Sequence, residues 1–141
     1  MWAILSKNRD AGLLVLRIWL GAVFLWVHGV PMLFKGDVVK TWQTVGEAIQ
    51  HWGIGWPPPK FWGFMAMLTE TGGIVLFIAG LLFRPSCLLL AIVMAVAATS
   101  HFAAEKTVEL GFHKGAHAIE LGIIFFCMIF IGPGKYSIDR E

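Results

Sequence analysis

The chain has 141 residues, of which 57% are hydrophobic and only 14% are charged. Soluble domains carry about 25% charged residues, because a folded chain of this size exposes a large surface to water. The composition therefore argues against a soluble globular domain. A net charge of +2 is also too small to form a surface that follows nucleic-acid phosphates. We expect a small integral membrane protein that contacts the lipid bilayer and binds no nucleic acid.

Four apolar stretches are long enough to cross a bilayer core of about 30 Å as helices. They are predicted at residues 11–33, 61–83, 86–103 and 114–131. The runs are continuous and lack the alternating pattern of a transmembrane β-barrel. We expect an all-α integral membrane protein, an up-down bundle of four transmembrane helices that forms a single domain over residues 1–141.

The segment between the first two stretches is long, and part of it has helical spacing. Its apolar residues fall on one face of a helix: Val38, Trp42, Val45 and Ile49. Over residues 38–50 this pattern predicts an amphipathic helix that is too short and too polar to span, and that lies at the membrane interface. Two interpretations stay open, a simple membrane anchor and a lid over a site that faces the same side.

An even number of spans places both termini on one side of the membrane. The basic residues near that side are Lys7, Arg9, Arg84, Lys135 and Arg140, and those near the other side are Lys35, Lys40, Lys60, Lys106 and Lys114. The excess of positive charge that marks a cytoplasmic side is nearly absent here. Arg17 tips the balance, so we expect both termini to be cytoplasmic.

Every predicted span carries at least one ionisable side chain. Such groups at bilayer depth usually face the interior of a bundle, because they are costly in lipid. The alternating directions of the spans bring most of them to the outer half of the bundle: His28, Glu70, His101, His117 and Glu120. His113 is expected at the mouth of this half, and Arg17 nearer the inner end.

Three interpretations of this cluster stay open. His117 and Glu120 lie one helical turn apart and, with His113, could bind a transition metal. The carboxylates and imidazoles could instead bind the head group of a quinone or pass protons. Finally, the polar groups could pair with one another and fix the register of the helices.

Several motifs resemble those of the DoxX family of small bacterial membrane proteins. They are Leu14–Arg17 with Gly21 and His28–Gly29, Glu70–Gly73 followed by Gly80–Pro85, His101, Glu120, and the ending Gly132–Asp139, which resembles the family's GPG-x-x-S-x-D tail. Their order and spacing cover nearly the whole chain. The resemblance marks the polar positions of the family as Arg17, His28, Glu70, His101 and Glu120.

The resemblance implies a four-helix fold in the bacterial cytoplasmic (inner) membrane and an association with redox physiology. Some members of this family are subunits of a thiosulfate:quinone oxidoreductase, and others are linked to membrane oxidoreductase complexes. More distant relatives are non-enzymatic assembly or trafficking factors. An enzyme of this type would be a quinone-linked oxidoreductase or one of its subunits.

We therefore expect a redox-associated membrane protein that binds a quinone-like or small sulfur-containing molecule, with quinone the expected cofactor. Glu70, His101 and Glu120 are the predicted catalytic residues, and Arg17, His28 and His117 the predicted ligand-binding residues. One alternative is a non-enzymatic subunit or assembly factor of a larger membrane complex. Another is a bundle that handles a metal or protons. A homo-oligomer, or partner subunits in a redox complex, would fit these hypotheses.

Overall fold

The computed structural model describes residues 8–34 and 36–139, so Lys7, Lys35 and Arg140 of the charge comparison lie outside the described residues. In the described part of the chain the regular elements are all helical. Four helices are long and apolar enough to cross a membrane: Arg9–Phe34, Pro59–Ala79, Phe83–Ala104 and Val108–Ile131. The prediction of an all-α membrane protein with four spans is confirmed.

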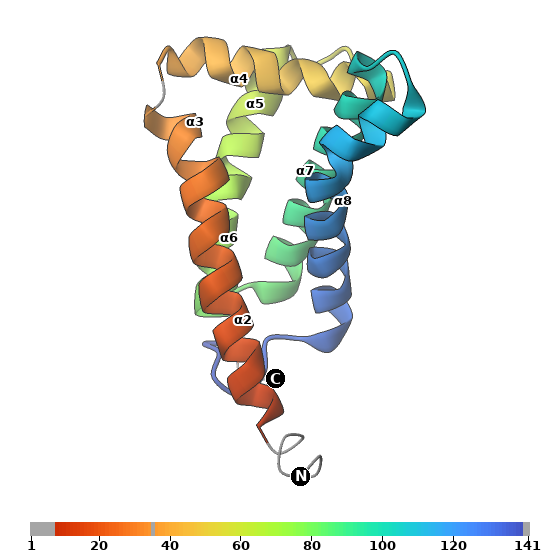
Figure 1. Ribbon diagram of the computed structural model, residues 1–141. Coiled ribbons are helices and arrows are strands. Elements are labelled where there is room, and N and C mark those ends of the chain that lie inside the picture. Colours follow the sequence, from red (N-terminus) through yellow and green to blue (C-terminus); the bar gives the residue numbers. More distant parts are fainter. Residues whose placement is uncertain (1–7, 35, 140–141) are drawn as a thin grey trace.

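The four spans run side by side in alternating directions (Figure 1). In chain order they comprise α2 (Arg9–Phe24), η1 (Leu25–Gly29) and α3 (Val30–Phe34); α5 (Pro59–Leu68), η3 (Thr69–Gly73) and α6 (Ile74–Ala79); α7 (Phe83–Ala104); and α8 (Val108–Ile131). Helices α7 and α8 pack along each other, and α2 packs against α6. The short elements η1 and η3 are π-helical turns within the first two spans.

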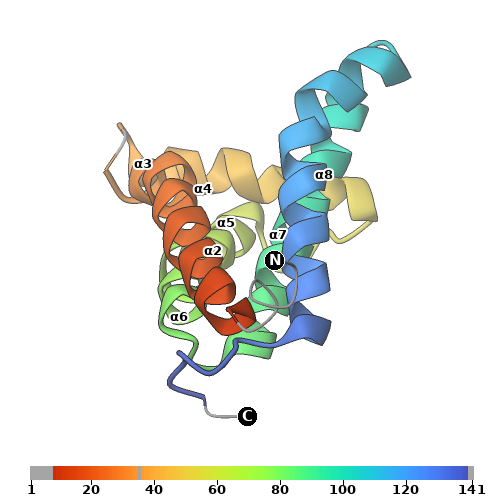
Figure 2. The same ribbon diagram turned by 60° about the horizontal axis from the view of Figure 1, so that its bottom comes forward.

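The predicted interfacial helix is α4 (Val38–Glu47), continued by the 3-10 helix η2 (Ala48–Trp52). It crosses one end of the bundle, which we call the α4 end. Figure 2 shows α4 reaching from the side of α2 and α3 toward the side of α7 and α8. The opposite end, where α2 begins and the segment after α8 runs, is called the terminal end.

Two predicted boundaries differ from the structure around residue 80. The second span ends at Ala79 and not at residue 83, because Gly80 and Leu82 adopt left-handed backbone angles with φ of 67° and 46°. The third span then begins at Phe83. Pro85 lies in the first turn of α7, where a missing N–H breaks no helical hydrogen bond.

The last span also begins earlier than predicted. Helix α8 starts at Val108 and not at residue 114, and the hydroxyl of Thr107 caps it by accepting a hydrogen bond from the backbone N–H of Leu110 at 3.3 Å. Its first turns carry Glu109 and His113. Because these residues are polar, hydropathy alone did not indicate where the helix begins.

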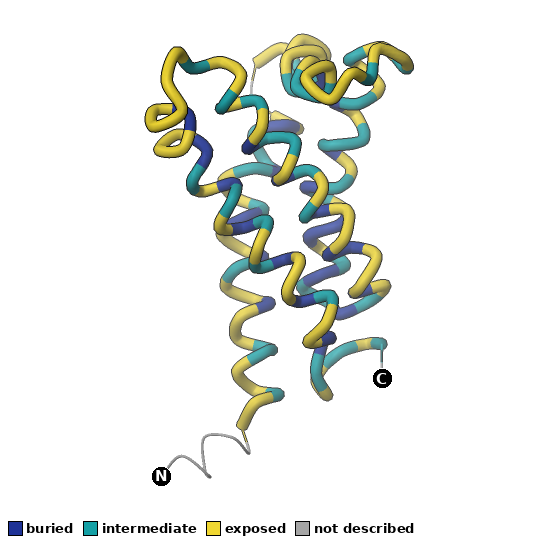
Figure 3. Tube along the Cα trace, turned by 90° about the vertical axis from the view of Figure 1, so that its right-hand side faces the viewer, coloured by how far each residue is buried: buried dark blue, intermediate teal, exposed yellow. Residues whose placement is uncertain are grey.

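The core of the bundle is a cluster of aromatic and aliphatic side chains. The ring of Phe125 contacts those of Phe24 and Phe77 edge to face, with ring centroids 5.5 and 5.4 Å apart. Phe77 also stacks on Phe83 at 5.2 Å. Figure 3 shows buried residues along one side of each span and exposed residues along the other, as expected for a bundle that turns its outer surface to lipid.

A network of hydrogen bonds closes the terminal end around Arg17, whose side chain is 1% exposed. Its guanidinium donates to the carbonyls of Phe77 at 3.2 Å and Ile78 at 2.8 Å, near the end of α6. It also donates to the carbonyls of Pro133 at 2.7 Å and Tyr136 at 3.0 Å. Arg17 thus joins the end of α6, where it supplies a donor to the Ile78 carbonyl, to the segment after α8.

The segment after α8 completes this closure. The carboxylate of Asp139 accepts a hydrogen bond from the backbone N–H of Phe83 at 3.1 Å, and the backbone N–H of Asp139 donates to the carbonyl of Gly80 at 2.8 Å. The backbone N–H of Lys135 donates to the carboxylate of Asp10 at 3.2 Å. The motif Gly132–Asp139 therefore joins α2, α6 and α7 at the terminal end.

Candidate functional site

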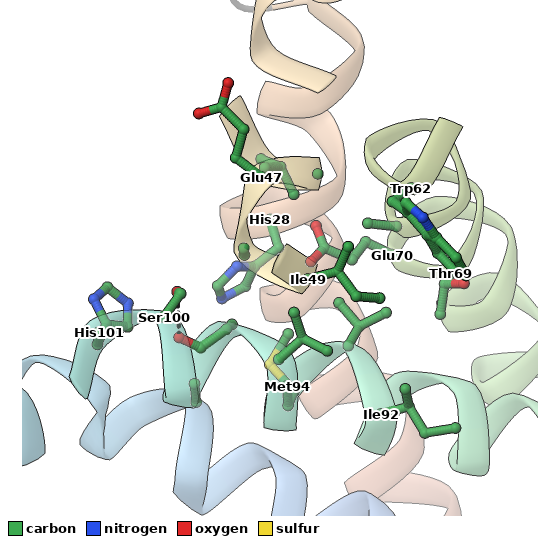
Figure 4. Close-up of a pocket in the computed structure, with 18 of the residues that line it drawn as sticks. His28, Glu47, Ile49, Trp62, Thr69, Glu70, Ile92, Met94, Ser100 and His101 are labelled. Carbon is green, nitrogen blue, oxygen red and sulfur yellow. Dashed lines mark hydrogen bonds between the residues drawn. The ribbon is translucent and has the colours of Figure 1, made fainter. Parts of the chain in front are cut away.

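A cavity of about 880 Å³ lies beneath α4 and η2, and Figure 4 draws part of its lining. Residues 44–51 line it from above, and all four spans contribute to its walls. Most of the wall is apolar, with Met32, Met65, Ile92 and Met94 among its residues. Its size and apolar lining are typical of sites that bind small organic molecules.

Two π-helical turns face each other at this cavity. Turn η1 carries His28 and turn η3 carries Glu70, and both side chains line the cavity. A Cβ atom at Gly29 would lie 2.9 Å from the backbone carbonyl oxygen of Glu70, so the glycine is what allows the turns to approach. Single π-helical turns within α-helices often occur at functional sites, because they redirect side chains.

Glu70 is the most deeply buried acidic residue of the described chain, with 7% of its surface exposed. Its carboxylate points into the cavity (Figure 4) and makes no hydrogen bond or ion pair with any described residue. Buried polar groups in native structures are nearly always paired, so an unpaired one requires an explanation. A bound molecule with a hydrogen-bond donor would supply the missing partner.

Trp62, on α5, also lines the cavity, near Glu70 in Figure 4. Its indole N–H has no acceptor among the described residues, but it is enclosed by protein and does not face the cavity. The carboxylate of Glu70 is therefore the unpaired group that a bound molecule can reach. It fits a molecule that carries a hydroxyl on an apolar body.

Two histidines form a pair beside these groups. The Nε2 atoms of His28 and His117 lie 3.4 Å apart, so one ring can donate its N–H to the other. The two rings stack with centroids 5.6 Å apart, and His28 also stacks on Phe24 at 4.7 Å. This pair joins the first and fourth spans at the level of the cavity. His101, on α7, lines the cavity as well, but its side chain is exposed.

The remaining predicted site residues lie elsewhere. Arg17 was expected to bind ligand, but its guanidinium is engaged by four carbonyls at the terminal end. Glu120 and His113 are exposed and do not line the cavity. On α8, Ala118 and Leu121 face the core. Of the ionisable residues of α8 that were expected in the cluster, only His117 reaches the cavity.

The predicted metal ligands do not come together. Among the residues that the structure describes, no group of three or more His, Cys, Asp or Glu side chains is placed to hold a metal ion. His117 pairs with His28, while His113 and Glu120 lie on the outer surface of α8. The described residues therefore give the metal hypothesis no support.

Sequence reasoning missed two features of the cavity. Trp62 belongs to a cluster of tryptophans that is typical of a membrane interface, and nothing in the sequence shows that its N–H is buried without a partner. His51 lies in η2 and lines the cavity from above. Its position just after the predicted amphipathic helix is the signal that could have placed it there.

These features define a class of protein: a four-span helical membrane protein with a largely apolar cavity near one end, roofed by a helix at the membrane interface. The chain belongs to the DoxX family, since the family's model matches residues 12–104, more than half of the chain. This range includes His28, Glu70, Trp62 and His101. Neither the search of curated proteins nor the search of solved structures gave a match.

Proposed function

We propose that this membrane protein binds a quinone-like molecule in the cavity beneath α4, with the polar head group beside Glu70. The observation that carries the proposal is the unpaired, buried carboxylate of Glu70 in an otherwise apolar cavity of about 880 Å³. The volume suits a substituted ring with part of a tail. The apolar walls suit a molecule that partitions into the membrane.

The unpaired carboxylate defines the chemistry of the head group. Glu70 accepts a hydrogen bond from a hydroxyl. A hydroquinone ring carries such a hydroxyl. A small sulfur-containing anion fits less well, because it would lose its hydration in an apolar space and face the charge of Glu70.

The neighbouring histidines give the site a route for protons. When a ligand hydroxyl donates to Glu70, the carboxylate is placed to accept its proton. His28 lies on the turn that faces Glu70 and contacts His117, so the pair can pass a proton between the first and fourth spans. His101 stands at the exposed part of the cavity. Glu120 has no role in this scheme, because it lies outside the cavity.

We also propose that the protein lies in the bacterial cytoplasmic membrane with both termini in the cytoplasm. The resemblance to bacterial members of the family supports the compartment, and the position of Arg17 at the terminal end supports the orientation. Reporter fusions to the C-terminus test it: a cytoplasmic reporter is active and a periplasmic one is not. The opposite pattern contradicts this orientation.

The binding proposal is tested by titrating the purified protein with a short-chain ubiquinol and following tryptophan fluorescence. The amide oxygen of Gln still accepts a hydrogen bond, but a bond to a neutral group is weaker than one to a charged group by about 1–1.5 kcal/mol, or roughly 5- to 10-fold in affinity. We expect Glu70→Gln to weaken binding by this factor. The control is Glu120→Gln, which changes a carboxylate outside the cavity and leaves the affinity unaltered. Equal affinities for wild type and Glu70→Gln would overturn the proposal.

A further inference from the structure

The outer face of α8 carries a carboxylate at a depth where an exposed side chain would contact the acyl chains of lipids. Glu120 lies near the middle of the 24-residue helix Val108–Ile131, about 18 Å from its first residue and about 16 Å from its last. Its side chain is exposed, and it has no hydrogen bond or ion pair with a described residue. Acidic side chains at this depth almost always face protein or water, because acyl chains offer them no partner.

Glu120 belongs to a stripe with the spacing of a helix-packing seam. His113, Glu120 and Cys127 follow one another every seven residues, and Ala116, Ile123 and Phe130 lie between them at positions that share the same face. We call these six residues the α8 stripe. All except Ala116, which is half-buried, are exposed in the chain as described. Alternating spacings of three and four residues are those of a seam between two helices that pack lengthwise.

We propose that the α8 stripe packs against the same stripe of a second copy of this chain, forming a two-fold dimer. Copies inserted in one orientation place their α8 helices parallel and at equal depth about an axis along the membrane normal. Each residue of the stripe then meets its own counterpart, as in an isologous interface. A second copy therefore brings to Glu120 a hydrogen-bonding group at the depth where one is needed.

The contact between the two Glu120 side chains is favourable when they share one proton. The protonated carboxyl then donates a short, charge-assisted hydrogen bond to the ionised one. A single polar residue in an apolar seam also fixes the register and the number of helices, because any other arrangement leaves it unpaired. The proposal concerns the outer surface of α8 and does not depend on what the cavity binds.

Native cysteines provide the test. Cys127 lies on the α8 stripe and is exposed, whereas Cys87 is 0% exposed in the core. Oxidation of membranes that contain the full-length protein is expected to join Cys127 to Cys127 and give a covalent dimer on a non-reducing gel. Cys127→Ser removes this product. Absence of the product in wild type, or its persistence in Cys127→Ser, would overturn the proposal.

Substitutions at Glu120 separate a specific contact from random collision. We expect Glu120→Ala to reduce the cross-linked fraction about fivefold or more, and Glu120→Gln to retain it, because two amides can hydrogen-bond across the seam. Ile123→Trp offers a second disruption that leaves the carboxylate in place and is expected to reduce it similarly. Thermal unfolding shows that each variant is folded. Unchanged cross-linking in both Glu120→Ala and Ile123→Trp contradicts the dimer, as does a cross-link from Cys127 to a different polypeptide.

The same assay on Glu70→Gln keeps the two proposals apart. Glu70 lies in the cavity and away from the α8 stripe, so this variant is expected to cross-link like the wild type. Loss of quinol binding with intact cross-linking would support both proposals, and intact binding with lost cross-linking in Glu70→Gln would contradict both.

Discussion

The two ends of the bundle treat buried polar groups in opposite ways. At the terminal end, Arg17 is saturated by four carbonyls, and the carboxylates of Asp10 and Asp139 accept backbone hydrogen bonds. At the α4 end, the Glu70 carboxylate faces the cavity and the Trp62 N–H is enclosed by protein, and neither has a partner among the described residues. A polar group buried with partners contributes to stability, whereas one buried without partners reduces it. This contrast supports our proposal that the terminal end holds the fold and the α4 end binds the ligand.

The attachment of α4 adds detail to this contrast. Gly46 and Gly63 bring α4 and α5 so close that a Cβ on either would collide with backbone of the other helix. On the far side of the cavity, η2 is joined to α7 by the hydrogen bond from the Trp52 indole to the hydroxyl of Thr99 at 2.7 Å. Element η2 also packs against α7, so the roof is held on both sides of the cavity, with the closer backbone contact on the side of α5. The structure thus places over the cavity the segment that was expected to be either an anchor or a lid.

The largest effect is expected from Arg17→Met. It leaves the carbonyls of Ile78, Pro133 and Tyr136 without the donor that Arg17 supplies and is expected to destabilise the protein by about 3–5 kcal/mol, since each unsatisfied buried carbonyl costs about 1–3 kcal/mol. Thermal unfolding in detergent measures the change. A variant as stable as wild type would show that the terminal end does not hold the fold.

The next effect is expected from Gly63→Ala. The new Cβ would overlap the backbone of Trp42 on α4, so the roof must shift, at about 1–3 kcal/mol. The thermal midpoint of unfolding and the affinity for quinol are both expected to fall. The control is Gly12→Ala, where a Cβ meets nothing within 4 Å. Equal behaviour of the two variants would argue against close packing of α4 on α5.

A smaller effect is expected from Trp52→Phe. It removes one hydrogen bond between η2 and α7 and is expected to cost about 0.5–1.5 kcal/mol. Hydrogen exchange of the α4 amides should accelerate while that of the α7 amides stays constant. Uniform acceleration in both helices would indicate global destabilisation and not release of the roof.

The smallest effect on stability is expected from Glu70→Gln. The carboxylate has no partner in the protein, so a neutral amide of the same size removes no interaction. We expect the thermal midpoint without ligand to stay equal to that of wild type or to rise. A clear fall would show that Glu70 supports the fold, and would remove the contrast between the two ends.

The sequence was sufficient to predict the number and approximate positions of the spans, because continuous apolar runs of this length rarely form anything other than membrane-spanning helices. Depth along the helices also brought His28, Glu70, His101 and His117 to one level, and all four line the cavity. Which side of each helix faces the interior of the bundle was harder to predict from the sequence. Glu120 and His117 share a broad face of α8, and only packing against α7 and the first span decides which of them turns inward.

Other features depend on contacts that a single sequence does not reveal. The π-helical turns at His28 and Glu70 involve one extra residue per turn, which leaves no distinct local pattern. Arg17 looks like a ligand-binding cation until the end of α6 and the segment after α8 are seen to meet around it. The unpaired N–H of Trp62 follows from tertiary packing alone.

The central claim is that the α4 end holds the ligand site. Photolabelling with an azido-quinol, followed by peptide mapping of the modified residues, tests it most directly. We expect adducts within residues 27–32, 44–51, 62–70 and 89–104, competed by excess unlabelled quinol and reduced in Glu70→Gln. Adducts confined to the lipid-facing tryptophans Trp19 and Trp26, and unaffected by competition, would contradict a specific site in the cavity.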